Sequence, residues 1–362
     1  MIKRNRVLVT CDADSQGLLL EELRRSQLCE MPGSWLDTGD AVQGSILLIE
    51  TELDFDEFSD ELERFGSVFV RHLAPVELEM PLKGSEEDLG ALYDLLPGLI
   101  DRLDPHGSFS VQSRILGTGK LPYRKVTLNE SLSQAIEEAT RAVMDCRKPD
   151  QVVSLLCSPT TAYLGVSRTQ KNRSEWPGGK HRFKKDDDQI SRAEFKLLEA
   201  FSVFGVDLPS KGRALDIGAS PGGWSRILAE RGLNVDAVDP GELDPRLANN
   251  RRIAHHRRRI QEYSAKVKRF DVIVNDMKMD ARDSIEIMLA FAPHLTFEGV
   301  AVITLKMPKT GTSPGRELDM IWEDFERLST CYRIVGARQL YHNRSEITVV
   351  LEPQARKFGY PN

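Results

Sequence analysis

The sequence predicts an α/β protein whose C-terminal half is a doubly wound, mostly parallel sheet, preceded by two small α+β units. Three observations lead to this prediction. From Ser191 onward, β-branched strands alternate with helical stretches of about 10–15 residues, a pattern typical of a parallel sheet covered on both faces. A glycine-rich turn joins the first of these strands to its helix. Before Ser191, short strands and amphipathic helices alternate without such regular spacing.

Composition limits the class of protein. The 362 residues suffice for two or three domains, and 40% apolar residues argue against a disordered chain. The net charge is −6, but residues 1–100 hold 8 lysines and arginines against 21 aspartates and glutamates, a net −13, so the remainder carries +7. This asymmetry hints at nucleic acid. Five scattered cysteines predict no disulfide framework and no metal site. Without a long apolar run, we expect no membrane contact and a cytoplasmic protein.

The first unit, residues 1–82, has the pattern β-α-β-β-α-β and predicts a ferredoxin-like domain. Its apolar runs and helical spacings place strands at 6–11, 44–49 and 67–71, and helices at 15–25 and 55–65. The second unit, residues 83–185, is predicted to hold helices at 86–103 and 129–146 and strands at 108–115, 151–157 and 161–167, followed by a basic linker at 168–185.

The third unit, residues 186–362, holds the parallel sheet. We expect strands at 213–217, 234–238, 253–256, 270–275, 300–305, 332–337 and 347–351, and helices at 224–231, 283–294 and 316–328. Ligands of such sheets bind beyond the carboxyl ends of the strands. The residues that act on a ligand should therefore lie at strand ends or helix starts.

The glycine loop at 215–224 reads LDIGASPGGW and has three enzymatic interpretations. A dinucleotide fingerprint needs a second glycine where Ser220 stands. A nucleophile elbow would take an oxyanion donor from the N–H of Pro221, which has none. The third interpretation, S-adenosylmethionine binding, suits Asp216, which could face the methionine ammonium, and Asp239, placed 21 residues after Gly218 to hold ribose hydroxyls.

Four polar residues occupy similar positions around the sheet. Lys196 lies on a predicted helix, Asp276 and Lys306 each follow an apolar strand, and Glu346 opens the last strand. Singly, each could be a solvated surface residue. Together with the glycine loop they favour a shared site.

These segments resemble the FtsJ-like RNA ribose 2′-O-methyltransferases. The stretches SRAEFKL, LDIGASPGGW, VIVNDM, VITLKM and RSEITVV carry the resemblance, which covers residues 191–353. It implies a Rossmann-like, seven-stranded methyltransferase sheet and a catalytic tetrad of Lys196, Asp276, Lys306 and Glu346. It also implies that S-adenosylmethionine is held by Asp216, Gly218, Ala219, Ser220, Pro221, Gly222, Gly223, Trp224, Asp239, Gln261 and Asp276.

The resemblance assigns Lys306 as the base that takes the ribose 2′-hydroxyl proton. A free lysine is protonated at pH 7, so a neighbouring ammonium that disfavours its charge is needed. We expect Lys196 to supply that ammonium, Asp276 to steer Lys306, and Glu346 to hold Lys196. Exchanged roles for the two lysines remain open, and no metal is needed.

One segment departs from the family. Many relatives place an aspartate after the third strand to contact adenine, whereas residues 255–261 here read HHRRRIQ. Gln261 or a backbone group is the evident substitute.

Basic runs predict how RNA would be held. Basic residues crowd 246–269, and the linker interleaves them with Trp176 and Phe183, which suits phosphate contacts and base stacking. Residues 109–182 also resemble a THUMP RNA-binding domain, and this order of units resembles large-subunit rRNA cytidine 2′-O-methyltransferases. The predicted RNA contacts are Arg114, Arg124, Lys125, Lys180, Arg182, Arg257, Arg258 and Arg259.

The leading hypothesis is an S-adenosylmethionine-dependent RNA ribose 2′-O-methyltransferase acting on ribosomal RNA, with transfer RNA as the alternative substrate. A non-catalytic RNA-binding protein with a vestigial methyltransferase fold is the rival from another class. Base methylation is disfavoured because Asn275-Asp276-Met277-Lys278 offers neither an Asn/Asp-Pro-Pro-aromatic motif nor a cysteine. The sequence identifies neither the modified nucleotide nor the oligomeric state.

Overall fold

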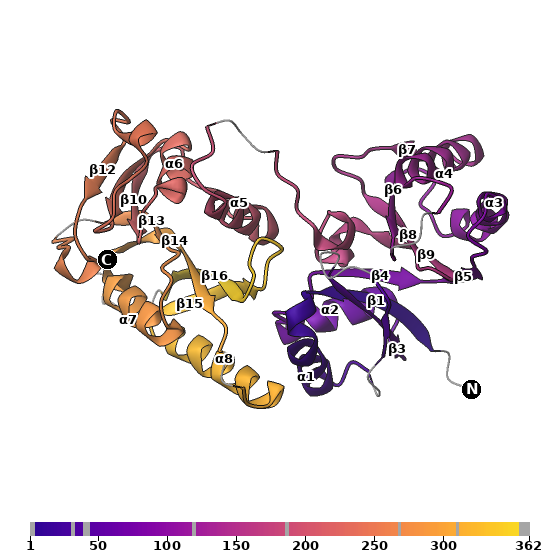
Figure 1. Ribbon diagram of the computed structural model, residues 1–362, viewed down its shortest axis with the longest axis horizontal. Coiled ribbons are helices and arrows are strands. Elements are labelled where there is room, and N and C mark those ends of the chain that lie inside the picture. The colour runs from indigo at the N-terminus through magenta and orange to yellow at the C-terminus, as the bar shows by residue number, and fades with distance from the viewer. Residues whose placement is uncertain are drawn as a thin grey trace. The chain divides into compact units, whose positions relative to one another are not determined.

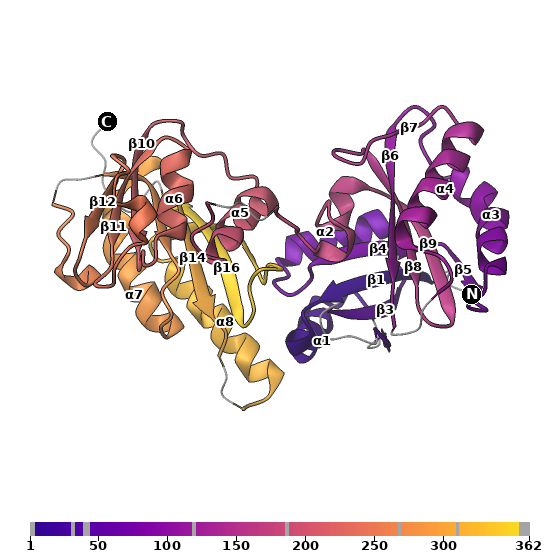
Figure 2. The ribbon, with the colours of Figure 1, turned by 45° about the horizontal axis from the view of Figure 1, so that its top comes forward.

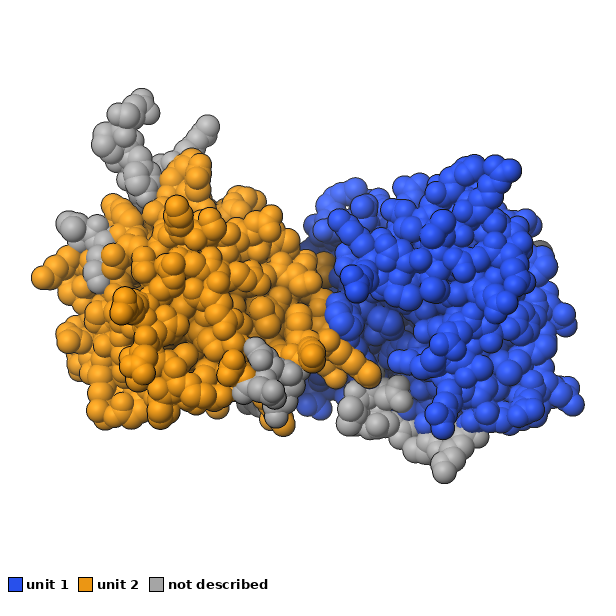
Figure 3. All heavy atoms as spheres, turned by 90° about the horizontal axis from the view of Figure 1, so that it is seen from above, with its two compact units in different colours: residues 1–180 blue, residues 181–362 orange. Residues whose placement is uncertain are grey.

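The computed structural model describes residues 4–29, 33–38, 44–117, 121–184, 188–266, 269–308 and 311–354. The chain divides into two compact units, Met1–Lys180 and His181–Asn362 (Figure 3). Lys185 and Lys268, which belong to the predicted basic runs, lie outside the described residues. Among the described residues, unit 1 contains two sheets and unit 2 contains one.

The first sheet of unit 1 is antiparallel, with strand order β2-β3-β1-β4. Its elements follow the predicted β-α-β-β-α-β order: β1 (Asn5–Cys11), α1 (Gln16–Ser26), β2 (Ser34–Leu36), β3 (Ser45–Thr51), α2 (Phe55–Phe65) and β4 (His72–Val76). Helix α2 begins at a capping box in which Asp54 and Glu57 bond reciprocally, and it ends at Gly66 with φ +78°.

The strand predicted at 67–71 is wrong, because β4 begins only at His72. The carboxylate of Glu22, on α1, accepts hydrogen bonds from the Ser67 hydroxyl and from the backbone N–H groups of Val68 and Phe69. Those N–H groups are therefore used by a side chain instead of a sheet partner.

The second sheet of unit 1 has five strands in the order β5-β9-β8-β6-β7 (Figure 1). Its elements are β5 (Leu78–Pro81), α3 (Glu87–Ile100), β6 (Ser108–Ile115), α4 (Lys125–Ala139), β7 (Val143–Met144), β8 (Gln151–Cys157) and β9 (Thr161–Arg168). Helices α3 and α4 cover one face and share its apolar core. The helix predicted at 129–146 instead ends at Ala139, because Thr140 is extended and a short edge strand follows.

Unit 2 is built on a seven-stranded sheet with the order β12-β11-β10-β13-β14-β16-β15. The strands from β12 to β14 are parallel, and β16 is antiparallel to both its neighbours. The elements are α5 (Ala193–Phe204), β10 (Gly212–Ile217), α6 (Gly223–Glu230), β11 (Leu233–Val238), β12 (Ile253–His256), β13 (Phe270–Asn275), α7 (Ala281–Phe291), β14 (Leu295–Lys306), α8 (Pro314–Leu328), β15 (Tyr332–Arg338) and β16 (Glu346–Pro353). This confirms the predicted doubly wound sheet.

Helices cover both faces of this sheet. Figure 2 shows α5 and α6 on one face and α7 and α8 on the other. Strands buried on both faces need continuous apolar runs, and Val272, Ile273 and Val274 of β13 are fully buried. Among the described residues, no helix has the length and apolar character to cross a bilayer.

Candidate active site

The carboxyl ends of the parallel strands meet at one edge of the seven-stranded sheet. The glycine loop follows β10, Asp239 follows β11, Asp276 follows β13, and Lys306 ends β14. Glu346 reaches the same edge from the opposite direction, because it begins the antiparallel strand β16 and pairs in register with Lys306. The topology thus gathers residues that are far apart in the sequence.

Lys196 is the centre of an ion cluster at this edge. Its Nζ lies 2.9 Å from Oδ1 of Asp276 and 2.5 Å from Oε2 of Glu346. The three side chains are only 14–16% exposed. Helix α5 supplies the lysine, and the ends of two strands supply the carboxylates. Three of the four predicted tetrad members are therefore in direct contact.

The two carboxylates fix the charge of Lys196. Burial by itself disfavours an ammonium, but the charges and hydrogen bonds of Asp276 and Glu346 outweigh it and raise the pKa of Lys196. Lys196 therefore keeps its proton at neutral pH.

Sequence reasoning missed Thr304 as a member of this cluster. Its hydroxyl donates a 2.5 Å hydrogen bond to Oδ1 of Asp276. Thr304 precedes Lys306 by two residues on β14, so both side chains point to the same face of the sheet. The spacing of two residues between Thr304 and Lys306 was therefore the signal in the sequence that could have identified Thr304.

Lys306 is exposed at the end of β14. Its register partner is Glu346, and directly paired residues project to the same face with their Cβ atoms about 4.5–5.5 Å apart. Asp276 was expected to steer Lys306, but its carboxylate contacts Lys196 and Thr304 instead. Glu346 was expected to hold Lys196, and the two side chains are in contact.

The glycine loop turns sharply at two positions. Gly218 has φ +76° and Gly222, which caps α6, has φ +108°. An added Cβ would stand 2.2 Å from Cγ of Met277 at the first position and 2.4 Å from Cδ1 of Leu247 at the second. Only glycine fits both the backbone conformation and the space. The loop therefore turns tightly at the strand edge, packed against the Met277 and Leu247 side chains.

Two carboxylates flank this loop. Asp216 is 2% exposed and accepts a 2.6 Å hydrogen bond from the Ser225 hydroxyl. Burial raises its pKa to about 7, assisted by the nearby charges of Asp276 and Asp239, while Ser225 opposes the rise. The Asp239 carboxylate accepts the backbone N–H groups of Ser220 and Gly241 at 3.2 and 2.6 Å.

The other residues predicted to hold the cofactor differ in their solvent exposure. The Trp224 ring is buried, and its indole N–H donates to the Ala193 carbonyl at 2.7 Å, so that side chain joins α6 to α5. Ala219 and Gly223 are buried within the loop, whereas Pro221 is exposed. Gln261 is exposed on the short 3₁₀ turn after β12.

The predicted RNA contacts divide into exposed and internal residues. The Arg114 guanidinium donates a 3.1 Å hydrogen bond to Thr10 and lies under Gly178, so it ties parts of unit 1 together. Arg257 is exposed and pairs with Glu242 at 2.6 Å. The remaining exposed members are Arg124, Lys125, Arg182, Arg258 and Arg259, and Lys180 is half-buried.

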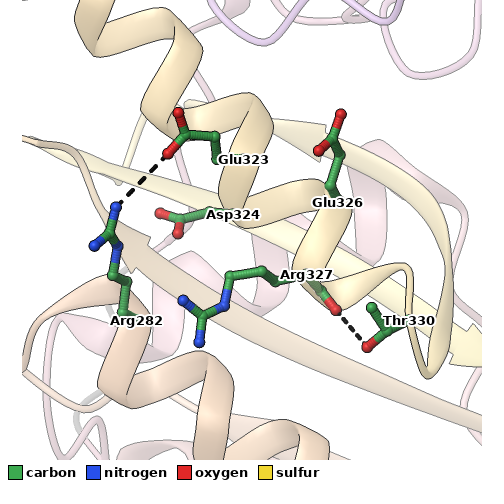
Figure 4. A pocket seen from close by; sticks show the side chains of 6 residues that line it. All are labelled: Arg282, Glu323, Asp324, Glu326, Arg327 and Thr330. Atoms are coloured by element: carbon green, nitrogen blue, oxygen red, sulfur yellow. Dashed lines mark hydrogen bonds and ion pairs between the residues drawn. The ribbon is translucent and has the colours of Figure 1, made fainter.

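A cavity of about 330 Å³ lies elsewhere in unit 2, where α8 meets α7 (Figure 4). It is lined by Arg282, Glu323, Asp324, Glu326, Arg327 and Thr330. None of the predicted site residues lines it, so it is separate from the candidate active site. Within the described ranges, no group of three or more His, Cys, Asp and Glu side chains could hold a metal ion.

Several known proteins are similar to this chain. Residues 189–308 match the model of the FtsJ-like methyltransferase family. The chain is 30% identical over 302 residues to a ribosomal RNA large subunit methyltransferase M from Marinobacter nauticus, covering 79% of this chain and 81% of that one. A relative of the same name from Serratia proteamaculans is 27% identical over 313 residues, with 82% of each chain covered. Among solved structures, TrmN from Thermus thermophilus aligns over 97% of this chain and 100% of its own, at 18% identity and a TM-score of 0.41.

The sheet, the glycine loop and the family match together define an FtsJ-like methyltransferase that uses S-adenosylmethionine. The longer matches, by their coverage and sequence identity, identify a narrower family within this class. The chain belongs to the family of ribosomal RNA large subunit methyltransferase M.

Proposed function

We propose that the protein transfers a methyl group from S-adenosylmethionine to a ribose 2′-hydroxyl of large-subunit ribosomal RNA. One observation carries this proposal: Lys196 is held as a cation between Asp276 and Glu346, while Lys306 stands beside Glu346 at the same strand edge. A fixed ammonium at the strand edge where a second lysine ends β14 suits the activation of a ribose 2′-hydroxyl.

The two lysines have different roles in this proposal. A general base must release its own proton before it can accept another, and the raised pKa of Lys196 prevents this. Lys306 therefore accepts the proton of the 2′-hydroxyl. Asp276, Glu346 and Thr304 are positioning residues that hold Lys196 in place.

The cofactor site follows from the loop and its carboxylates. S-adenosylmethionine supplies a methyl group already activated on a sulfonium, so the protein's task is alignment. Asp216 would face the methionine ammonium, whose charge compensates a carboxylate buried with few donors. Each carboxylate oxygen has two lone pairs, so Asp239 can still accept two ribose hydroxyls. The backbone from Gly218 to Gly222 would lie along the cofactor.

The ribosomal substrate rests on the names of the relatives and on the exposed arginines. The curated relatives are named as methyltransferases of large-subunit ribosomal RNA. Arg258 and Arg259 are exposed after β12, on the cofactor side of the sheet, where a phosphate backbone could pass. Such a substrate places the protein in the cytoplasm.

The test is a methyl-transfer assay with labelled S-adenosylmethionine and separately purified large-subunit ribosomal RNA and transfer RNA, both from cells that lack the gene. We expect label in the ribosomal RNA, at one nucleotide whose 3′ linkage resists alkaline hydrolysis because its 2′-oxygen is blocked. Label in a base, or only in transfer RNA, would contradict the proposal. Tight RNA binding without any label would instead favour a non-catalytic RNA-binding protein.

A further inference from the structure

A group of aromatic rings is carried in part by the segments that carry the tetrad, and the proposed chemistry does not use it. Its members are Phe183, Phe195, Tyr341 and His342, hereafter the ring cluster. Phe183 stacks on Phe195 with centroids 5.8 Å apart and planes 18° from parallel. His342 lies 5.1 Å from Phe195 and 5.7 Å from Phe183, and Tyr341 meets His342 edge-on at 5.1 Å.

The ring cluster shares its supporting elements with the tetrad. Phe195 directly precedes Lys196 on α5. The turn formed by residues 341–345 carries Tyr341 and His342 and leads straight into Glu346. The N–H of Met307, the residue after Lys306, donates to the Ser345 carbonyl at 3.0 Å. Lys196 therefore directly follows a ring of the cluster, and the residue after Lys306 is hydrogen-bonded to the turn that carries Tyr341 and His342.

The turn is held in place by buried polar groups. The carboxylate of Glu199, 1% exposed on α5, accepts the N–H groups of Tyr341 and His342 at 2.7 and 2.9 Å. The Asn343 side chain exchanges hydrogen bonds with Thr348 on β16. Such fixation keeps the two rings in position, which lowers the entropy cost of stacking a ligand on them.

All four rings are partly exposed, unlike the large aromatics of the cores, such as Phe270 and Tyr332, which are fully buried. Other aromatics such as Phe204 and Phe291 are also partly exposed, and the basic residues beside Phe183 distinguish the ring cluster from them. The segment that carries Phe183 alternates, with Arg182 and Lys184 exposed on either side of the ring. Basic side chains that contact phosphates, next to an aromatic ring that stacks on a base, are typical of proteins that bind single-stranded RNA.

We propose that the ring cluster is a stacking site for an RNA base, either the base of the methylated nucleotide or its immediate neighbour. This inference rests on the proposed function, because it assumes that RNA occupies the tetrad. Stacking would hold an unpaired base while its ribose, or the ribose next to it, lies at Lys306. The site selects single-stranded or looped RNA and adds a planar contact that phosphate-binding arginines do not provide.

The test compares variants that remove a ring with variants that keep one. Phe183→Leu and His342→Leu retain apolar bulk but lose the π face, whereas Phe183→Trp and His342→Phe retain it. Both His342 variants also lose the 2.9 Å hydrogen bond between Nε2 and the His181 carbonyl, so the effect of the π face at that position is the difference between His342→Leu and His342→Phe. Phe297→Leu, at a 61% exposed ring near the start of β14, is the matched control. Three quantities are measured for each variant: KM for large-subunit ribosomal RNA, KM for S-adenosylmethionine, and Kd for the same RNA by filter binding.

We expect each leucine variant to raise KM and Kd for RNA about tenfold, since stacking on one ring contributes about 1–3 kcal/mol. KM for S-adenosylmethionine should stay unchanged, and the aromatic variants and the Phe297→Leu control should resemble the wild type. RNA constants that do not change in the leucine variants overturn the inference. So does a loss shared by the leucine and aromatic variants together with a lower melting temperature, because that describes packing alone. If the wild type methylates no RNA, the proposed function fails, and the binding constants still decide whether the rings contact RNA.

Discussion

Two buried carboxylates, Glu22 in unit 1 and Asp216 in unit 2, show how the same group is used for architecture and for a ligand. Both are almost inaccessible, at 0% and 2% exposure. Glu22 accepts three hydrogen bonds, two of them from consecutive backbone N–H groups. Within the described chain, the hydrogen bonds to Asp216 come from Ser225 alone, and further carboxylates lie nearby.

The difference in hydrogen-bond partners indicates which buried carboxylate is structural and which can bind a ligand. Burial raises the pKa of both carboxyls, and at Glu22 three hydrogen bonds from the chain oppose that rise, so their loss is a loss of stability. Asp216 has fewer donors at a strand edge, and a cationic ligand would stabilise its ionised form further. The predictions below test this distinction between structural and functional charges, from the largest effect to the smallest.

The largest effect is expected at Lys306, on the functional side of the comparison. Lys306→Ala should lower kcat for RNA methylation about 10²–10⁴-fold, the usual contribution of a general base. Because Lys306 is exposed and its only expected role is chemical, the melting temperature and the affinity for S-adenosylmethionine should not change. Lys278→Ala, at an exposed lysine two residues after Asp276, is the control. Full activity in Lys306→Ala would remove this residue from the mechanism.

Glu22→Gln tests the structural side. An amide can accept on only one of its two atoms, so one of the N–H groups of Val68 and Phe69 loses its acceptor. Leaving a buried donor unpaired costs about 1–3 kcal/mol, which chemical denaturation of unit 1 should report. Affinity for S-adenosylmethionine, a property of unit 2, should be unaffected. The neighbouring Glu21→Gln, which removes only surface ion pairs with Arg24 and Arg25, should cost less than about 1 kcal/mol. Equal destabilisation by both substitutions would erase the distinction.

The pH dependence of cofactor binding tests Asp216 directly. With its pKa near 7, this carboxyl is mostly neutral at pH 6 and mostly ionised at pH 8. A ligand ammonium favours the ionised form, so affinity for S-adenosylmethionine should rise with pH through 7, by up to about tenfold. Asp216→Asn cannot ionise, so it provides the baseline that includes titration of the ligand itself. Parallel profiles for the wild type and Asp216→Asn would place Asp216 with Glu22 among the structural carboxylates.

The smallest effect is expected at the exposed arginines. Arg258→Gln should weaken RNA binding a few-fold and lower the dependence of log K on log salt by about 1, as expected for one lost phosphate contact. Arg114→Gln should instead lower the melting temperature, because this guanidinium bonds Thr10 inside unit 1. Arg316→Gln, on α8 and paired with Glu323, is the control for removal of a surface charge. An unchanged salt slope in Arg258→Gln would argue against a phosphate at that position.

Much of the fold was predictable because local pattern and tertiary structure agree. The strands of unit 2 are continuous apolar runs. Helix α2 was predicted at 55–65 from its amphipathic spacing, and its caps lie at the same two ends. The failures occur where a distant side chain overrides the local pattern. Residues 67–71 look like a strand, but Glu22, 45 positions away, takes the hydrogen-bonding groups that a strand would use.

The candidate site was predictable only in part. The alternation of strands and helices implies that residues at the carboxyl ends of strands share one edge, which places Asp276 and Lys306 in the same neighbourhood. Glu346 begins its strand and reaches this edge only because β16 is antiparallel. Which groups touch depends on side-chain reach, and for that reason the preference of Asp276 for Lys196 was not visible in the sequence. The predicted roles of Arg114 and Trp224 show the same limit. Both are residue types typical of a ligand site, yet each donates its hydrogen bond to an internal partner.

The antiparallel strand β16 has a consequence for biosynthesis. It inserts between β14 and β15, both of which leave the ribosome before it does. A nascent chain that ends at Arg338 has made β15 but not the strand that separates β15 from β14, and it lacks Glu346. The charged cluster around Lys196 therefore closes only after Glu346 has been synthesised. Translation products that stop before this residue lack the cluster.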